Sequence, residues 1–364
     1  MKANVQFPFY AKASLVFIGL VAFVGMLFVA QSIIVPLIYS TILAIVLSPV
    51  VSFLVKRGMN RVVAITITLT LLILTTSLII ILLSTQIIQF GDSFPILVEK
   101  FHLLLEQGVS WASTNFNISP HKINLWINEK NREIISVTSS AIAQTLINTG
   151  SVLVILVLIP VYIFMILFYQ PLLLEFIHKL FSTSKHIEVN EVLSATKKII
   201  QSYLVGLLLE ALIVALLNST SLLILGIDYA ILLGLIGAIL NVIPYIGGII
   251  AVALPMLIAL ATKSPTYAFL VLVAYIIIQF IDNNFIIAKV VASKVEINAL
   301  VSIVVVLVGG ALWGIPGMFL SIPLTAILKV IFDHIDGLKP WGYLLSNHLP
   351  VNSKFSVSKI KSSN

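Results

Sequence analysis

The chain has 364 residues, of which 60% are hydrophobic and only 10% are charged. Soluble domains carry roughly a quarter of charged residues, so this composition excludes a water-soluble enzyme, a nucleic-acid-binding protein and a disordered regulator. The net charge of +7 is spread over few side chains, as in the basic edges that orient a membrane protein. The sequence has no cysteine, which excludes disulfides and Cys-ligated metal sites. We therefore expect an all-α polytopic membrane protein.

Three apolar segments fill residues 1–84. A helix needs about 20 mostly apolar residues to cross a bilayer, and 13–34, 37–55 and 62–83 have about this length, with Pro36 predicted as the turn between the first two. A cleaved signal peptide is the alternative for the first segment, but a second span follows at once. Basic residues after the second span and near the N-terminus predict that both lie on the cytoplasmic side.

The rest of the chain divides by composition. Residues 85–147 mix acidic and basic side chains with apolar ones at helical spacing, which predicts an extracytoplasmic amphipathic region with a second helix starting at Ser119-Pro120. We expect a fourth transmembrane helix over 148–170, a basic cytoplasmic interfacial helix over 171–201, a transport core over 202–332 and a mostly disordered cytoplasmic tail over 333–364. Apolar helical faces in 85–147 would suit contacts between copies of the chain.

Two segments of the core are too long and too broken for one straight helix. Residues 229–262 and 299–329 each follow an ordinary span, and each contains a tract of glycine and proline near its middle. Paired interruptions of this kind mark the binding site of many transporters. They predict either long kinked spans in parallel repeats or re-entrant hairpins in inverted repeats. The lysines at 263, 289 and 294 favour the hairpins, because two of them would then lie inside.

One polar cluster lies near the end of the span before the second broken segment. Gln279, Asp282 and Asn283 share one helical face, with Asn284 beside them. An acid within the membrane suggests a functional role by default, so Asp282 could bind a cation or a proton while the amides orient a solute. The alternative is a cap at the membrane interface, with Lys289 as a partner for Asp282.

A second acid, Glu210, lies deeper in its span, on a stripe with Tyr203 and Asn218. A carboxylate at this depth is costly to keep ionised, which suits proton coupling. The alternative is a protonated acid that donates one hydrogen bond between helices.

The broken tracts add a third group of candidates. An opened backbone exposes N–H or C=O groups that can bind ions, whereas glycines can also serve only to let helices pack closely. We assign these candidate residues to the solute or ion path: Asn241, Pro244, Tyr245, Gly247, Gly310, Gly314, Pro316 and Gly317.

The same tracts resemble the autoinducer-2 exporter family of permeases. The matching stretches are Asn241-Val-Ile-Pro-Tyr-Ile-Gly-Gly248, Asp282-Asn-Asn284 and the tract from Gly309 to Pro323. The resemblance implies about eight hydrophobic segments in the inner membrane of a bacterium, with an extramembrane helical region between the third and fourth. It also implies export of small molecules such as autoinducer-2, and some relatives are described as sodium/proton antiporters.

The chain departs from the family pattern at several polar positions. The family often has Tyr-x-Arg-Gly-Gln where this chain keeps Tyr203 and Gly206 but has Val205 and Leu207. A lost polar pair is consistent with a different solute.

The sequence carries neither a phosphate-binding G-x-x-x-x-G-K-[ST] loop nor a protease motif. We therefore expect no enzyme and no cofactor or metal, but a secondary exporter of a small polar solute, coupled to protons or sodium ions. A sodium/proton antiporter, a channel and a non-transporting scaffold that binds partners through 85–147 are the alternatives.

Overall fold

The computed structural model describes residues 8–116, 149–243, 247–291 and 297–347. Within these ranges every regular element is a helix, and seven helices are long and apolar enough to cross a membrane. Two shorter apolar helices accompany them. The expected all-α polytopic fold is confirmed.

The first two helices, α1 (Phe9–Val29) and α2 (Gln31–Lys56), meet at Ala30. The predicted turn at Pro36 is wrong, because Pro36 lies inside α2, where it is buried. Proline removes one backbone donor, but helices in a membrane tolerate this where neighbouring protein packs on them. The chain therefore turns at a small residue and continues through the proline.

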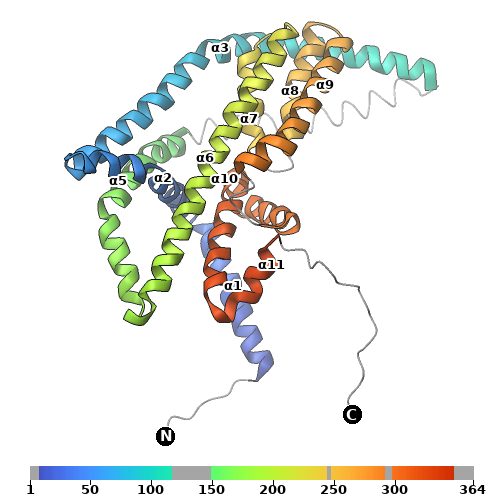
Figure 1. The fold of residues 1–364 in the computed structure, drawn as a ribbon. Coiled ribbons are helices and arrows are strands. Elements are labelled where there is room, and N and C mark those ends of the chain that lie inside the picture. The colour runs from blue at the N-terminus through green and yellow to red at the C-terminus, as the bar shows by residue number, and fades with distance from the viewer. Residues whose placement is uncertain (1–7, 117–148, 244–246, 292–296, 348–364) are drawn as a thin grey trace, which may run out of the picture.

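Helix α3 (Arg61–Phe116) has 56 residues and runs without a break across the boundary predicted at residue 84. Its apolar part covers residues 61–91, and the polar remainder extends past the other helices in Figure 1. The helix continues through Gly91 and Pro95 as well as through the change of composition, so none of these features ends it. The second helix predicted from Ser119-Pro120 lies outside the described residues.

Two long helices follow, α5 (Thr149–Leu180) and α6 (His186–Ile224), joined by the short 3₁₀ turn η1 (Thr183–Lys185). Residues 171–201, expected to form one interfacial helix, are instead shared between the end of α5 and the start of α6. Helices α2, α3 and α5 pack together. Arg61 at the start of α3 donates to the carbonyl of Leu167 in α5 over 2.6 Å and so joins these two helices.

The first broken segment folds back on itself. Helix α7 (Ala230–Asn241) and helix α8 (Gly247–Thr262) pack against each other. At 12 and 16 residues, they are about 18 and 24 Å long, which is less than the ~30 Å hydrocarbon core. A Cβ at Gly247 would collide with the carbonyl oxygen of Leu240, so only glycine fits at this close approach.

The second broken segment, α10 (Ala299–His334), also folds back on itself. Gly314 has φ 64° and ψ −145°, a conformation that favours glycine. The chain reverses there, so a Cβ at Gly309 would come within 2.5 Å of the Gly317 carbonyl oxygen. Both segments thus have the hairpin form rather than the kinked one. Which side of a membrane their loops face stays a prediction.

Between the hairpins lie α9 (Pro265–Ile281) and η2 (Asp282–Val291), in which the α-helix becomes a π-helix at Asp282. Such wider turns are rare and frequently found at functional sites. They shift the side chains that follow relative to α-helical spacing.

Part of the tail is folded, which corrects the expected disorder after residue 332. The turn η4 (Asp336–Leu338) leads into α11 (Lys339–Leu345), which packs on α10. Asn298 fixes this short helix by donating to the carbonyls of Leu344 and Ser346, at 2.7 and 3.2 Å.

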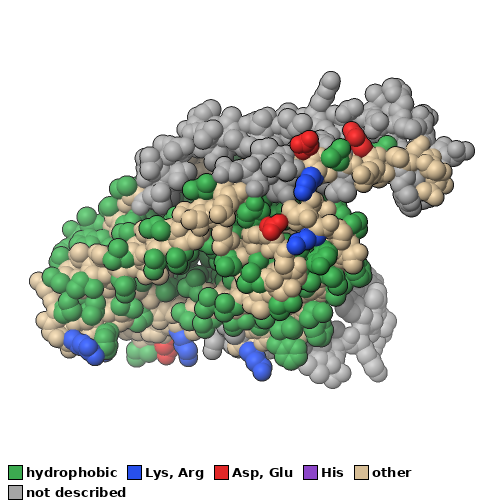
Figure 2. Space-filling model, turned by 90° about the horizontal axis from the view of Figure 1, so that it is seen from above, with side chains coloured by type: hydrophobic (Ala, Val, Ile, Leu, Met, Phe, Trp, Pro, Cys, Tyr) green, Lys and Arg blue, Asp and Glu red, His purple; other side chains and the backbone are tan. Residues whose placement is uncertain are grey.

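Three clusters of buried hydrophobic residues lie along α6. One unites the end of α6 with α7, α8 and α9, and a second unites Tyr203 and Leu207 of α6 with α2 and α10. A small third cluster joins Val214 of α6 to Ala238 of α7 and Ile286 of η2. Helix α1 buries no residue at all. Hydrophobic side chains cover much of the face in Figure 2, where charged ones are few. This surface fits a lipid surrounding.

Candidate functional site

A cavity of about 750 Å³ lies between the two hairpins, beside α6. This volume is within the range of small-molecule sites, which are mostly apolar with a few polar groups. Its walls are formed by Tyr203, Leu207 and Glu210 of α6, Asn241, Val242 and Ile243 at the end of α7, Gly248 and Val252 of α8, Leu272, Tyr275, Ile276 and Gln279 of α9, Asn283 and Ile287 of η2, and Ser302 and Ile322 of α10.

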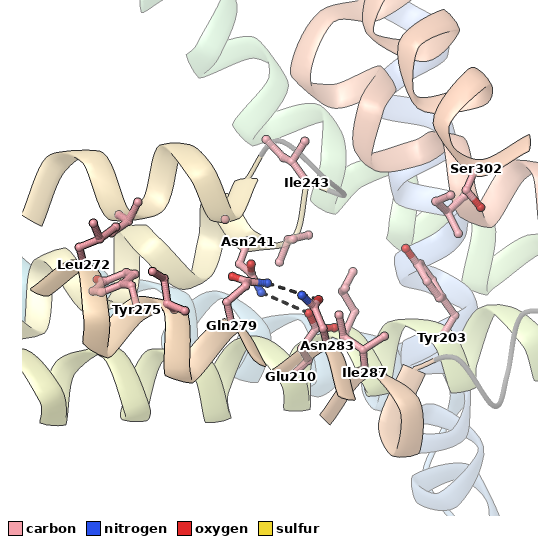
Figure 3. Close-up of a pocket in the computed structure, with 16 residues that line it drawn as sticks. Tyr203, Glu210, Asn241, Ile243, Leu272, Tyr275, Gln279, Asn283, Ile287 and Ser302 are labelled. Atoms are coloured by element: carbon pink, nitrogen blue, oxygen red, sulfur yellow. Dashed lines mark hydrogen bonds between the residues drawn. The ribbon is translucent and has the colours of Figure 1, made fainter. Parts of the chain in front are cut away.

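Asn241 brings the two predicted acids together. Its side-chain Nδ2 donates to Asp282 Oδ2 over 2.8 Å and to Glu210 Oε1 over 3.5 Å. The three residues come from η2, α6 and the last position of α7, where the broken segment opens. Figure 3 places Asn241 beside Glu210, Gln279 and Asn283 in the middle of the cavity.

Both carboxylates are buried, with 4% of Glu210 and 1% of Asp282 exposed. None of the ion pairs among the described residues involves either of them, and Lys289, proposed as a partner for Asp282, is exposed. Two buried charges that share one amide are costly without a cation or a proton. The arrangement therefore suits the binding of positive charge.

The amide cluster predicted on one helical face is largely brought to the cavity. Gln279 and Asn283 both line it, and Gln279 Nε2 donates to Asn283 Oδ1 over 3.4 Å. Asn284 is exposed, and its side chain donates to the carbonyl of Phe280 in the preceding turn. The structure thus separates Asn284 from the other three residues.

The candidates at the second break have a different place. Gly310, Gly314, Pro316 and Gly317 lie in the bend of α10, and none of them lines the cavity. A Cβ at Gly310 would come within 2.6 Å of the Met318 side chain. Their geometry serves the folding of the hairpin, and a role in the solute path stays a prediction. Pro244 and Tyr245 lie outside the described residues.

The profile of the AI-2E transporters matches residues 16–337, which include the whole cavity. This chain belongs to the AI-2E transporter family. The resemblance to autoinducer-2 exporters is thereby confirmed, and the family to which the chain belongs is one of multi-pass membrane transporters.

Individual relatives of this AI-2E transporter are distant but match over most of their length. YrrI of Bacillus subtilis (strain 168) is 26% identical over 316 residues, which cover 84% of this chain and 87% of YrrI. YhhT of Escherichia coli (strain K12) is 24% identical over 336 residues, or 91% and 93% of the two chains. The AI-2 transport protein TqsA of the same strain is 24% identical over 325 residues, or 87% and 90%.

Sequence reasoning missed Tyr275 and Ser302 of the AI-2E transporter's cavity. Tyr275 could have been found, because it lies four residues before Gln279 and seven before Asp282, on the same helical face. No feature of the neighbouring sequence predicts that Ser302 lines the cavity. It does so only because the second hairpin packs opposite the first.

Proposed function

We propose that this AI-2E transporter is a secondary-active exporter of a small polar solute, similar to autoinducer-2, driven by a proton or sodium gradient. One observation carries the proposal: Glu210 and Asp282 meet at Asn241, at the break of the first hairpin and beside a cavity of about 750 Å³. The amides of Gln279 and Asn283 and the Tyr275 ring offer hydrogen bonds and an apolar face to a polar solute.

The grouping of the helices suggests how access would alternate. Helix α8 packs on α7 and α9, which both pack on α6, while α10 packs on α6, α2 and α11. The cavity lies between these two groups, so a rigid movement of one against the other would change the side on which it opens. Within each group, the residues that line the cavity would move little relative to one another.

Coupling would follow from the shared amide. Positive charge bound at Asp282 or Glu210 lowers the repulsion between the two carboxylates. Asn241 contacts both, so a change in charge would alter the end of α7 and the cavity wall. Solute and ion would then each affect the affinity for the other.

A sodium/proton antiporter is the second candidate. It is favoured by the two buried acids, which need no further solute to exchange cations. A scaffold acting through 85–147 would depend on residues such as Phe101 and Trp111 rather than on Asp282. The scaffold therefore differs from both transporters in which substitution abolishes activity, and the transported species separates the two transporters.

For location, we propose the cytoplasmic membrane of a bacterium, with both termini in the cytoplasm. The basic residues after α2, Arg57 and Arg61, would lie on the same side as the N-terminus. Copies of the chain could associate through α3, whose polar part extends beyond the other helices.

The experiment is flux in proteoliposomes that contain the purified full-length chain. Autoinducer-2 release is measured with no gradient, with a proton gradient and with a sodium gradient. Gradient-dependent flux supports the exporter. Sodium/proton exchange without flux of the solute favours the antiporter, and no transport of either kind contradicts both.

A further inference from the structure

A second internal space lies beside the solute cavity and is much smaller, about 10 Å³. It is enclosed by α6, α7, α8, α9 and the start of η2, and it shares Asn241, Tyr275 and Gln279 with the larger cavity. A space of this size holds about one water-sized sphere. It is therefore too small for the solute and large enough for one water molecule or one dehydrated ion.

Three buried oxygen atoms with no hydrogen-bond partner belong to residues that line this space. They are Oδ1 of Asn218, the hydroxyl of Tyr275 and Oδ1 of Asp282. The three residues are 2%, 7% and 1% exposed. Only one other buried side-chain atom among the described residues lacks a partner, Ser48 Oγ, and Ser48 does not line this space. Buried polar atoms are nearly always paired, so three at one place indicate a missing ligand.

We propose that this space binds one dehydrated monovalent cation, sodium in preference to potassium. Carboxylate, amide and phenol oxygens are the ligands that hard cations prefer. Asp282 supplies the negative charge through Oδ1, because its Oδ2 already accepts from Asn241. A hydrated divalent ion would not fit, since magnesium keeps several of its waters.

The negative charge separates a cation from a water molecule. Water could hydrogen-bond to the three oxygens, but it would leave the ionised form of Asp282 uncompensated in the protein interior. No ion pair among the described residues supplies that compensation, and the remaining walls include the apolar Val214, Ala251 and Ile278. A bound cation satisfies the oxygens and the charge together.

The ion would act on the solute cavity through Asn241, and this step rests on the proposed transport function. The same Nδ2 that contacts Asp282 also contacts Glu210, which lines the larger cavity. A cation at Asp282 would thus hold Asn241 and the end of α7 in one position. The solute would then bind to a preformed cavity wall, which raises its affinity. By reciprocity the solute should raise the affinity for sodium by the same factor.

Binding of ²²Na⁺ to the purified full-length chain tests the site without any transport. We expect saturable binding that unlabelled sodium displaces at lower concentration than potassium does. Tyr275→Phe removes one ligand oxygen and should weaken binding at least several-fold. Gly237→Ala adds a Cβ placed 3.1 Å from Asn218 Nδ2 and 3.4 Å from the Tyr275 hydroxyl, so it should reduce the space and weaken binding too.

Ser48→Ala is the matched control, since it removes a buried hydroxyl that is also unpaired but lies on α2. It should bind ²²Na⁺ as the wild type does. Gly237→Ala should not unfold α7, because alanine favours a helix more than glycine does. Its helical content, measured by circular dichroism, should therefore not fall below that of the wild type.

The outcomes separate this inference from the proposed function. If the wild type binds no ²²Na⁺, or if Tyr275→Phe and Gly237→Ala bind it unchanged, the cation site is wrong, whatever the flux measurements give. If sodium binds as expected but no solute is transported, the site stands and the exporter proposal falls.

Discussion

The carboxylates of Glu210 and Asp282 share one hydrogen-bond donor, the side-chain amide of Asn241. Each acid lies on a different helix, and both are almost fully buried. The donor is the last residue of α7, directly before the chain opens. Any change of charge at one acid must therefore act on the other and on the end of α7.

Replacing the two acids by amides of the same size should remove coupling. Asp282→Asn and Glu210→Gln keep the volume of the side chain but cannot carry the charge, so we expect gradient-driven flux to fall to background in each variant. Elution from a size-exclusion column should stay as in the wild type. Glu175→Gln is the control, because Glu175 is an exposed acid paired only with Lys179. Normal transport by both core variants would show that the roles are misassigned.

The bend of α10 should tolerate no side chain at its crossing point. Gly309→Ala places a Cβ against Ser321 Oγ and near the Gly317 carbonyl oxygen. Overpacking of this kind costs about 1–3 kcal/mol, which should lower the unfolding temperature in detergent. Gly25→Ala in α1 is the matched control, since nothing lies within 4 Å of its added Cβ. Equal unfolding temperatures for both variants would contradict the close contact.

Docking of α11 should depend on one asparagine. Asn298 caps α10 by accepting from Val301 N over 2.9 Å and also donates to two carbonyls at the end of α11. Loss of an N-cap costs about 0.5–2 kcal/mol. Asn298→Ala should therefore lower stability and raise hydrogen exchange in residues 339–345. Asn284→Ala, which loses only one exposed bond to Phe280, should leave that exchange unchanged.

Cysteine labelling should place the hairpin loops relative to the membrane. The chain has no native cysteine, so Ser264→Cys and Ser293→Cys can be labelled without background. Inverted repeats predict that an impermeant reagent added outside intact cells reaches position 264 but not position 293. Labelling at position 293 but not at position 264 would contradict this orientation, because each hairpin would then enter the membrane from the side opposite to the one predicted.

The sequence was sufficient for the class of fold and for part of the site. Apolar length revealed the spans, and helical spacing put Gln279, Asp282 and Asn283 on one face. Paired breaks located both hairpins, because Gly314 and Gly247 occupy positions that no other residue fits. Each of these inferences depends on the residues of one segment.

What the sequence left open depends on contacts between segments. The pairing of Asn241 with Asp282 joins two helices far apart in the chain, and no local pattern encodes it. The turn at Ala30 and the folded α11 were missed for a related reason. Tertiary packing lets α2 continue through Pro36, and Asn298 holds a helix of only seven residues that would be marginal alone.

Helix α6 carries residues of the two larger clusters, with Tyr203 and Leu207 in one and Leu222 in the other. Glu210 lies between these positions in the chain, about one turn before Val214 of the third cluster. If the two groups of helices move against each other as proposed, α6 cannot follow both as a rigid rod. It would flex or twist between Leu207 and Leu222, and Glu210 would then lie within the pivot.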